Sequence, residues 1–303
     1  MTRVATMTFN NVISSAMRRS QERLAESQMQ LNTEKKVQSY GELGGDASRV
    51  LSASSMLAQQ DAQNAVAKRV NTTLGFYDTS LNAIDDSLSD LKTTLLKVIG
   101  TGDSADLGKA VENAFVDFRN ALNQNEAGVP IFAGAQTDTS PFTPKTLDDV
   151  AALADPGDAF ANDDVRSSAR LSDNVDVEYG IGASDIGTGL VKAFQTLAGL
   201  GDFGDKLTDA QTAGLQTAIA QIEEGLKGVR SVNAKNGDLM NHVDALSDRS
   251  AERSKLLTQV VGDAVDADLG QVAMDIDART TILNASYSVF GQLQNLSLVN
   301  FLR

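Results

Sequence analysis

Cysteine and tryptophan are absent from this chain of 303 residues, and His242 is its single histidine. Without cysteine there can be no disulfide and no thiolate metal site. A zinc site needs three or four ligands, so a lone histidine is most often a surface or packing residue. Aromatic residues are only 5% of the chain, which favours slender helix-on-helix packing over the thick core of a compact enzyme. We expect no metal and no cofactor.

Proline is also scarce. The four prolines all fall within residues 130–156, at positions 130, 141, 144 and 156. Because proline is strongly disfavoured inside helices, this distribution predicts two long helical arms, residues 1–129 and 157–303, on either side of a non-helical insertion.

Positive charge is in short supply, since the formal net charge is −14. Nucleic acid is therefore not an expected partner, because phosphate binding needs a basic face. Residues 140–205 hold 12 acidic and four basic side chains, which predicts a solvent-exposed middle. No apolar run reaches the length of a membrane span, and the N-terminus has no apolar signal-peptide core. Membrane insertion and a cleaved signal peptide are not expected.

An unbroken heptad pattern is the clearest feature of the first arm. Its apolar residues follow a 3-4 spacing that is typical of a coiled-coil seam: Leu74, Tyr77, Leu81, Ile84, Leu88, Leu91, Leu95 and Val98. Gly100 and Gly102 then predict a break, after which a second amphipathic helix runs from near Ser104 to Gly128 and folds back on the first.

The second arm repeats this organisation. Thr208 and Gln211 form a capping-box pattern that predicts the start of a long amphipathic helix. A break is expected at Gly262. Beyond it, apolar residues recur every seven positions in the last helix: Leu269, Ile276, Leu283 and Phe290.

The two chain ends carry complementary patterns. A weaker apolar stripe at the N-terminus includes Ile13, Met17, Leu24 and Leu31. Residues 1–40 hold six bases and three acids, whereas residues 262–303 hold five acids and two bases. The simplest prediction is that the ends pair as a coiled coil, although two independent surface helices remain the alternative. Polar residues in both stripes make such a pair marginal alone, which is typical of a subunit that polymerises.

No group of residues predicts catalysis, so we do not expect an enzyme. "DADLG" (266–270), "DNVDVEYG" (173–180) and "GDFGD" (201–205) lack the ligand spacing of an EF-hand, and the first is better explained as an acidic helix start. "VPIFAG" (129–134) and "DVEYGI" (176–181) have strand character and predict a small hairpin-rich domain, with Gly128 releasing the preceding helix.

Five stretches together resemble the flagellin superfamily, and most closely its branch of hook–filament junction proteins. They are "LNTEKKVQS" (31–39), "GDASRVLSASSM" (45–56), "GVPIFAGAQTDTSPF" (128–142), "VEYGIGASDIG" (177–187) and "DADLGQVAMDIDARTTILNASYSVFGQLQNLSLVNFLR" (266–303). The chain departs from the family at Glu34, where glycine is usual, and at 40–45, where a proline-containing turn is usual.

The resemblance implies a mainly α fold. It would be an elongated antiparallel coiled-coil helical rod built from both chain ends, with a small β-rich domain inserted in the middle. Residues 1–40 and 263–303 would form the two halves of a helical assembly domain, and 41–129 and 206–262 the two halves of the rod. Residues 130–205 would be the inserted, outward β-rich domain.

The resemblance also implies a structural role in the bacterial flagellum, in a ring that adapts hook to filament. Partners would be other copies of the chain, the hook protein, another hook-associated protein or flagellin, and an export chaperone. Location would be extracellular, after export without a cleaved signal. The apolar side chains expected to line the assembly surface are Ile13, Met17, Leu24, Leu31, Leu283, Phe290, Leu293, Leu296, Leu298 and Phe301. A short flagellin-type filament subunit is the close alternative, and a glycan- or cation-binding module in 130–205 the remote one.

Overall fold

A computed structural model describes the backbone of residues 2–301 and the side chains of residues 11–292. It divides into two compact units, and each unit combines segments from both halves of the chain. The first contains residues 1–58 and 254–303, and the second residues 59–253. The predicted mainly α class is confirmed, because long helices dominate and the described residues form only two small two-stranded sheets.

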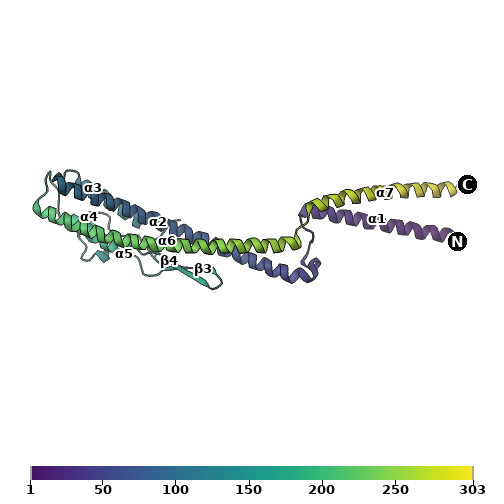
Figure 1. Ribbon diagram of the computed structural model, residues 1–303, viewed down its shortest axis with the longest axis horizontal. Helices are drawn as coiled ribbons and strands as arrows, with labels where there is room; N and C mark the ends of the chain where they lie inside the picture. Colours follow the sequence, from purple (N-terminus) through teal and green to yellow (C-terminus); the bar gives the residue numbers. More distant parts are fainter. Residues whose placement is uncertain (1, 302–303) are drawn as a thin grey trace. The chain divides into compact units, whose positions relative to one another are not determined.

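The first unit is a helical pair with a short connection. Helix α1 (Thr2–Thr33) lies antiparallel to α7 (Leu269–Phe301), as Figure 1 shows. The 3₁₀ helix η1 (Tyr40–Asp46) leads into α2 (Ala47–Thr101), whose first turns belong to this unit. The last turns of α6 (Asp209–Val265) complete it. The predicted pairing of the two chain ends is confirmed.

The second unit is built on the remaining lengths of α2 and α6, which run antiparallel beside three shorter helices (Figure 1). The shorter helices are α3 (Leu107–Leu122), α4 (Leu147–Ala151) and α5 (Ala183–Ala198), with the 3₁₀ helix η2 (Pro156–Ala159). Two antiparallel hairpins complete it: β1 (Asn125–Glu126) with β2 (Val129–Pro130), and β3 (Ser167–Ser172) with β4 (Val175–Tyr179).

The predicted heptad seam is the core of this second unit. All eight of its residues, from Leu74 to Val98, are buried. They form one apolar cluster with Leu215, Ile222, Leu226 and Val229 of α6. A second group of rings joins α3 to α5, with Phe115 and Phe118 at 5.5 and 5.4 Å from Phe194 between centroids.

Helix ends follow the predicted signals in some places and depart from them in others. Helix α2 stops at Thr101, and Gly102 takes a positive φ of 73°, as the glycines at this point predicted. Helix α6 begins at Asp209 behind the predicted capping box, in which the Gln211 amide donates to Thr208 Oγ1 at 3.2 Å. The break predicted at Gly262 is wrong. Helix α6 continues through it to Val265, because an isolated glycine weakens a helix without forcing it to end.

The stretch "GVPIFAG" is not the helix end that the sequence suggested. Helix α3 already stops at Leu122, where Asn123 makes paired hydrogen bonds with the backbone of Phe142, each 3.0 Å long. Ala127 and Gly128, with φ of 51° and 88°, form the tight turn of the β1–β2 hairpin. Residues 131–133 are buried but lie outside any strand, so only Val129 and Pro130 of the expected strand at 129–134 form one.

The acidic segment 143–175 is ordered by local caps. Thr146 Oγ1 accepts from the Asp149 amide while Asp149 accepts from the Thr146 amide, which starts α4. Asp149 accepts hydrogen bonds from the backbone amides of Lys145 and Thr146. These bonds, with the larger effect from Lys145, hold the pKa of Asp149 below its ordinary value. Strand β3 follows and pairs with β4, which confirms the strand expected near 176–181.

Candidate assembly interface

The contact between α1 and α7 is only partly closed. Ile13, Met17 and Leu24 of α1 and Leu283 and Phe290 of α7 are half-buried. Ser27 and Val272 are buried, alone among the described side chains of the two helices. Leu31 is 42% exposed. Leu293, Leu296, Leu298 and Phe301 lie outside the residues whose side chains the structure describes.

Polar side chains cross the same contact. Arg279, which interrupts the heptad spacing of α7, donates from Nη1 to the carbonyl oxygen of Arg23. Gln21 Nε2 donates to the hydroxyl of Tyr287 at 2.6 Å. These bonds make the pair more specific in its register than its small apolar area would by itself.

A set of backbone bonds fastens the pair at its base, where α1 ends and α7 begins. The Lys36 amide donates to the Val265 carbonyl, and the Ala267 amide donates to the Glu34 carbonyl, both at 2.9 Å. Lys35 Nζ lies 2.5 Å from Asp266 Oδ1. Glu34 adopts a left-handed φ of 57°, a conformation that glycine adopts without strain.

The carboxylate of Glu42 holds the connection between α1 and α2 in place. Glu42 accepts from the Gln38 amide and from the Ser39 hydroxyl, both at 2.9 Å. The backbone bond from Gln38, followed by the bond from Ser39, lowers the pKa of Glu42. Because the ionised form makes these bonds, the connection is held at neutral pH and loosens as the pH falls through the lowered pKa.

The outer side of the pair carries uncovered apolar side chains. Ile13, Ala16 and Met17 of α1 and Ile282, Ala285, Ser286 and Val289 of α7 line an open apolar groove of about 370 Å³. Ile282 is 58% exposed and Val289 is 52% exposed. Val12, Met29, Met274 and Tyr287 are further exposed large side chains of the two helices. We call Val12, Ile282 and Val289, together with the groove beside them, the outer apolar face.

Sequence reasoning missed these outer residues because it followed a single seven-residue stripe. The available signal was that α7 carries apolar side chains on more than one face, which is typical of a helix that is buried all round. The described side chains of the helical pair therefore present more apolar surface than the two helices cover for each other.

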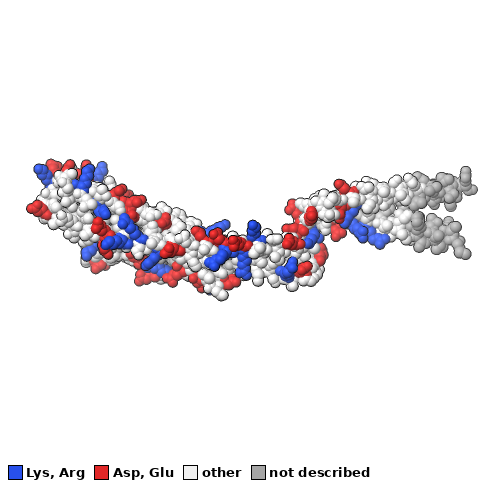
Figure 2. Space-filling model, in the orientation of Figure 1, with Lys and Arg blue, Asp and Glu red and all other residues white. Residues whose placement is uncertain are grey.

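Basic side chains outnumber acidic ones on α1, whereas acidic side chains outnumber basic ones on α7. Arg18, Arg19 and Arg23 are exposed on α1, and acidic side chains gather at the start of α7, as Figure 2 shows. Asp268 caps α7 by accepting from the Gly270 amide at 2.9 Å and the Gln271 amide at 3.1 Å. The helix-start explanation of "DADLG" is thereby confirmed.

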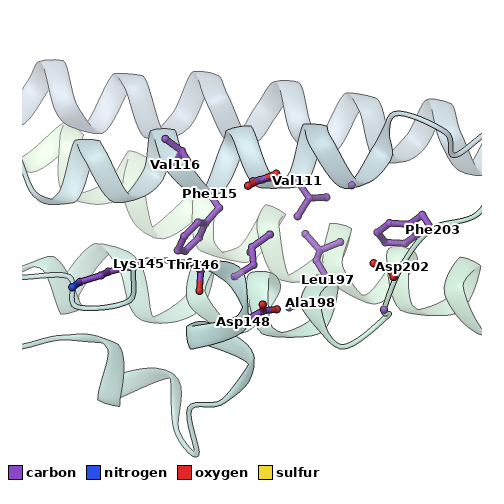
Figure 3. Close-up of a pocket in the computed structure, with 14 residues that line it drawn as sticks. Val111, Phe115, Val116, Lys145, Thr146, Asp148, Leu197, Ala198, Asp202 and Phe203 are labelled. Carbon is purple, nitrogen blue, oxygen red and sulfur yellow. The ribbon is translucent and has the colours of Figure 1, made fainter.

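A separate cleft of about 510 Å³ opens in the second unit between α3, α4 and the end of α5. Val111 and Phe115 from α3 and Leu197 from α5 face into it (Figure 3). Asp148 and Asp202 lie at its edge (Figure 3). Its lining combines apolar side chains with Glu112, Lys145, Asp148 and Asp202. Across the described residues, no group of three acidic, histidine or cysteine side chains is placed to hold a metal ion.

Known proteins resemble this chain both in sequence and in fold. No family model matches the chain. It is 24% identical to flagellar hook-associated protein 3 of Escherichia coli (strain K12), in an alignment that covers 88% of this chain and 93% of that protein. The chain is similar to flagellar hook-associated proteins. The resemblance found in the sequence motifs is confirmed by a match that extends over almost the whole length of both proteins.

Solved structures share the fold. A putative flagellar hook-associated protein from Vibrio parahaemolyticus has a TM-score of 0.59 at 18% identity, covering 72% of this chain and 96% of that one. FlgL of Bacillus cereus has a TM-score of 0.56 at 13% identity, covering 71% and 99%. None of the helices, over their described residues, has the length and hydropathy to cross a membrane.

Proposed function

We propose that this chain is a structural subunit of the bacterial flagellum that forms a ring at the junction between hook and filament. Helices α1 and α7 make the assembly surface of this ring. The observation that carries the proposal is the outer apolar face, in which Ile282 and Val289 are more than half exposed beside an apolar groove.

Exposed apolar surface of this kind is a cost to an isolated chain and a source of stability in an assembly. Covering a large aliphatic side chain stabilises a complex by about 1.5–3 kcal/mol. Most described apolar members of the α1–α7 contact are only half-buried, so the pair gains more from a neighbour than a closed helical hairpin would. Contiguous apolar patches on soluble proteins mark interaction sites.

The expected assembly residues retain their proposed role. Ile13 and Met17 line the groove, and Leu24, Leu283 and Phe290 support it from the α1–α7 contact. Leu31 is available on the surface. Leu293, Leu296, Leu298 and Phe301 follow Phe290 in the sequence.

Neighbouring copies, the hook protein and a further hook-associated protein or flagellin are the proposed partners. The chain would be delivered outside the cell by the flagellar export route with the help of a chaperone, without removal of a signal peptide. A structural role in assembly requires no catalytic group.

Single substitutions on the outer apolar face test the assembly surface. We expect Ile282→Asp and Val289→Asp to stop filament formation, because each places a charge where a neighbour must exclude water. Val165→Asp is the matched control, since Val165 is 57% exposed but lies in the second unit. Circular dichroism should show unchanged helix content in all three variants. Normal filaments in both α7 variants would contradict the assigned surface.

Deletion of the gene separates the junction role from the filament role. Loss of a junction protein should leave hooks without filaments and release flagellin into the medium. Loss of the filament subunit should instead remove the main secreted flagellar protein. The number of copies per flagellum, measured by quantitative mass spectrometry of purified flagella, decides between a thin ring and a long filament.

A further inference from the structure

The cleft between α3, α4 and the end of α5 in the second unit has an apolar floor. Val111 and Phe115 of α3 and Leu197 of α5 form this floor, and they are 3%, 1% and 2% exposed (Figure 3). Leu147 and Phe203 are half-buried members of the lining. Because none of these five side chains carries a polar atom, a ligand gains only apolar contact from them.

The charged side chains of the lining are all exposed and form the rim of the cleft. Glu112, Asp148 and Asp202 contribute three carboxylates, against the single ammonium group of Lys145. Three negative charges and one positive charge leave the rim with a net charge of −2. None of the three carboxylates forms an ion pair with another described residue. The rim is therefore free to attract a cationic partner.

An apolar centre inside a charged rim is the arrangement found at the most important contacts between proteins. Small-molecule sites instead place a few polar groups inside the pocket, where they fix the orientation of the ligand. The floor of this cleft has no such groups, which favours a side chain of another protein as its occupant. That side chain should be large and apolar and should have basic neighbours, because the rim is acidic.

Leu256 of α6 fits this description. It is 65% exposed, the highest value among the exposed large apolar side chains of the described residues. Arg253 and Lys255 lie within three positions of it, whereas the nearest acidic residue, Glu252, is four positions away. The other exposed large apolar residues have at most one basic residue within three positions. Neither Arg253 nor Lys255 forms an ion pair with another described residue.

We propose that the cleft receives Leu256 of a second copy of this chain. The leucine side chain packs on Phe115 and Leu197, and the cations of Arg253 and Lys255 meet the carboxylates of the rim. This inference rests on the proposed function, in which copies of the chain meet in one assembly. The contact joins two different surfaces, so it continues from copy to copy until the assembly closes into a ring or extends as a filament.

Cysteine cross-linking of the full chain tests this contact without background, because the natural sequence has no cysteine. One copy carries Asp148→Cys and a tag that changes its mass, and the other copy carries Lys255→Cys. The mixed dimer should form about tenfold more than with Asp90→Cys in place of Asp148→Cys, because docking raises the effective concentration of the two thiols. Asp90 is exposed in the second unit and lies outside the cleft lining. Equal yields from the two pairs would overturn the proposal.

A substitution of Leu256 tests the occupant itself. Leu256→Asp, in the copy that carries Lys255→Cys, should reduce the mixed dimer to the yield of the Asp90→Cys pair, because it places a charge against the apolar floor. Leu51→Asp is the matched control, since Leu51 is 58% exposed in the same unit and should leave the yield unchanged. Circular dichroism should show the same helix content in both variants. A cross-link that survives Leu256→Asp would contradict the proposal.

Reversal of charges tests the rim separately. Glu112→Lys with Asp202→Lys, in the copy that carries the cysteine in the cleft, should lower the yield of mixed dimer. Arg253→Glu in the other copy should then restore part of it. Added salt should also lower the yield between copies with natural charges. A yield that responds to neither the substitutions nor salt would contradict the charge pairing on which the choice of occupant depends.

Flagella purified from cells that express both cysteine variants give the last readout. Position 148 of one copy should cross-link to position 255 of another. A cross-link from position 148 to a different protein, without one to position 255, would assign the cleft to that protein and overturn the proposal. The outer apolar face would stand in that case, because its test is filament formation by Ile282→Asp and Val289→Asp. Normal filaments in those two variants, with the cross-link intact, would contradict the outer apolar face and support the cleft contact.

Discussion

Single residues with left-handed backbone conformations decide several turns of this chain. Gly128 and Gly134, the two glycines of "GVPIFAG", have φ of 88° and 70°. Their surroundings differ. A side chain at Gly128 would meet open space, whereas a Cβ at Gly134 would lie 3.0 Å from the Asp163 carbonyl and even closer to Oδ1 of the same residue.

This difference predicts unequal effects of the same substitution. Gly128→Ala should cost about 1–2 kcal/mol from backbone strain alone. Gly134→Ala should cost more, about 2–4 kcal/mol, because Asp163 must also release the amides of Ala135 and Val165, which it holds at 3.0 Å. Urea unfolding of the two variants measures both values. A similar loss in the two would show that Asp163 moves aside without cost.

At Glu34 a residue other than glycine occupies a left-handed backbone conformation, so substitution by glycine should stabilise the fold. Glu34 has a φ of 57°, and its carbonyl oxygen accepts from Ala267. We expect Glu34→Gly to stabilise the base of the α1–α7 pair by about 0.5–1 kcal/mol, because relief of strain exceeds the added entropy of the unfolded chain. Glu26→Gly, inside α1, should cost about 1 kcal/mol. Hydrogen exchange across residues 24–38 reports the effect, and a loss of protection in both variants would contradict it.

Tyr77 makes stability depend on pH in the alkaline range. Its hydroxyl donates to the Ile131 carbonyl at 2.8 Å, and burial raises the pKa of Tyr77 to about 12. The unfolded chain loses this proton near its ordinary pKa of about 10. The contribution is therefore full below about pH 10 and is lost between about 10 and 12.

We expect the free energy of unfolding to fall more steeply with pH in this range for the natural chain than for Tyr77→Phe. Tyr287→Phe is the control, since Tyr287 is exposed in the first unit and should leave the slope unchanged. Urea unfolding at several alkaline pH values gives the slopes. Identical slopes for all three proteins would mean that Tyr77 ionises without disturbing the fold.

At the scale of elements, the helices differ in what stabilises them. Leu88 is fully buried between α2 and its neighbours, whereas Leu96 on the same helix is 52% exposed. Leu88→Ala should cost about 3–5 kcal/mol because it leaves a cavity in the seam. Leu96→Ala should change stability by no more than about 0.5 kcal/mol. Thermal unfolding followed by circular dichroism compares the stabilities of the two variants. Similar losses of stability would show that Leu88 is not part of the core.

Short elements follow a different rule, since caps rather than packing define them. Helix α4 has only five residues and begins at the reciprocal bonds between Thr146 and Asp149. The Asp163 carboxylate orders its loop in the same way, and its pKa is lowered by the amides of Ala135 and Val165. Such contributions hold above the ordinary pKa of aspartate and are lost as the pH falls through the lowered value.

At the scale of the whole molecule, the two units should respond differently to truncation. Removal of residues 264–303 deletes α7 and leaves α1 without its partner, but it leaves every residue of the second unit in place. We expect the truncated chain to keep the protection of residues 74–98 against hydrogen exchange and to lose that of residues 11–33. It should not enter the flagellum. Incorporation of the truncated chain at normal levels would contradict the role proposed for α7.

The sequence by itself determined the helical arms, the seam from Leu74 to Val98 and the pairing of the chain ends. These features depend on local periodicity, on caps such as Thr208 with Gln211, and on proline, all of which act within a few residues. The motifs also predicted a resemblance to flagellar proteins, and the comparison confirms similarity to flagellar hook-associated protein 3.

Only the tertiary structure decided where α3 ends, how residues 143–175 fold, and which apolar side chains of α7 stay uncovered. Asn123 ends α3 by bonding to Phe142, which is 19 positions away in the chain. Ile282 and Val289 look like any other apolar residues until α1 is seen to leave them exposed. Contacts between distant segments are set by three-dimensional packing, and a local pattern in one helix holds no information on which neighbour covers it.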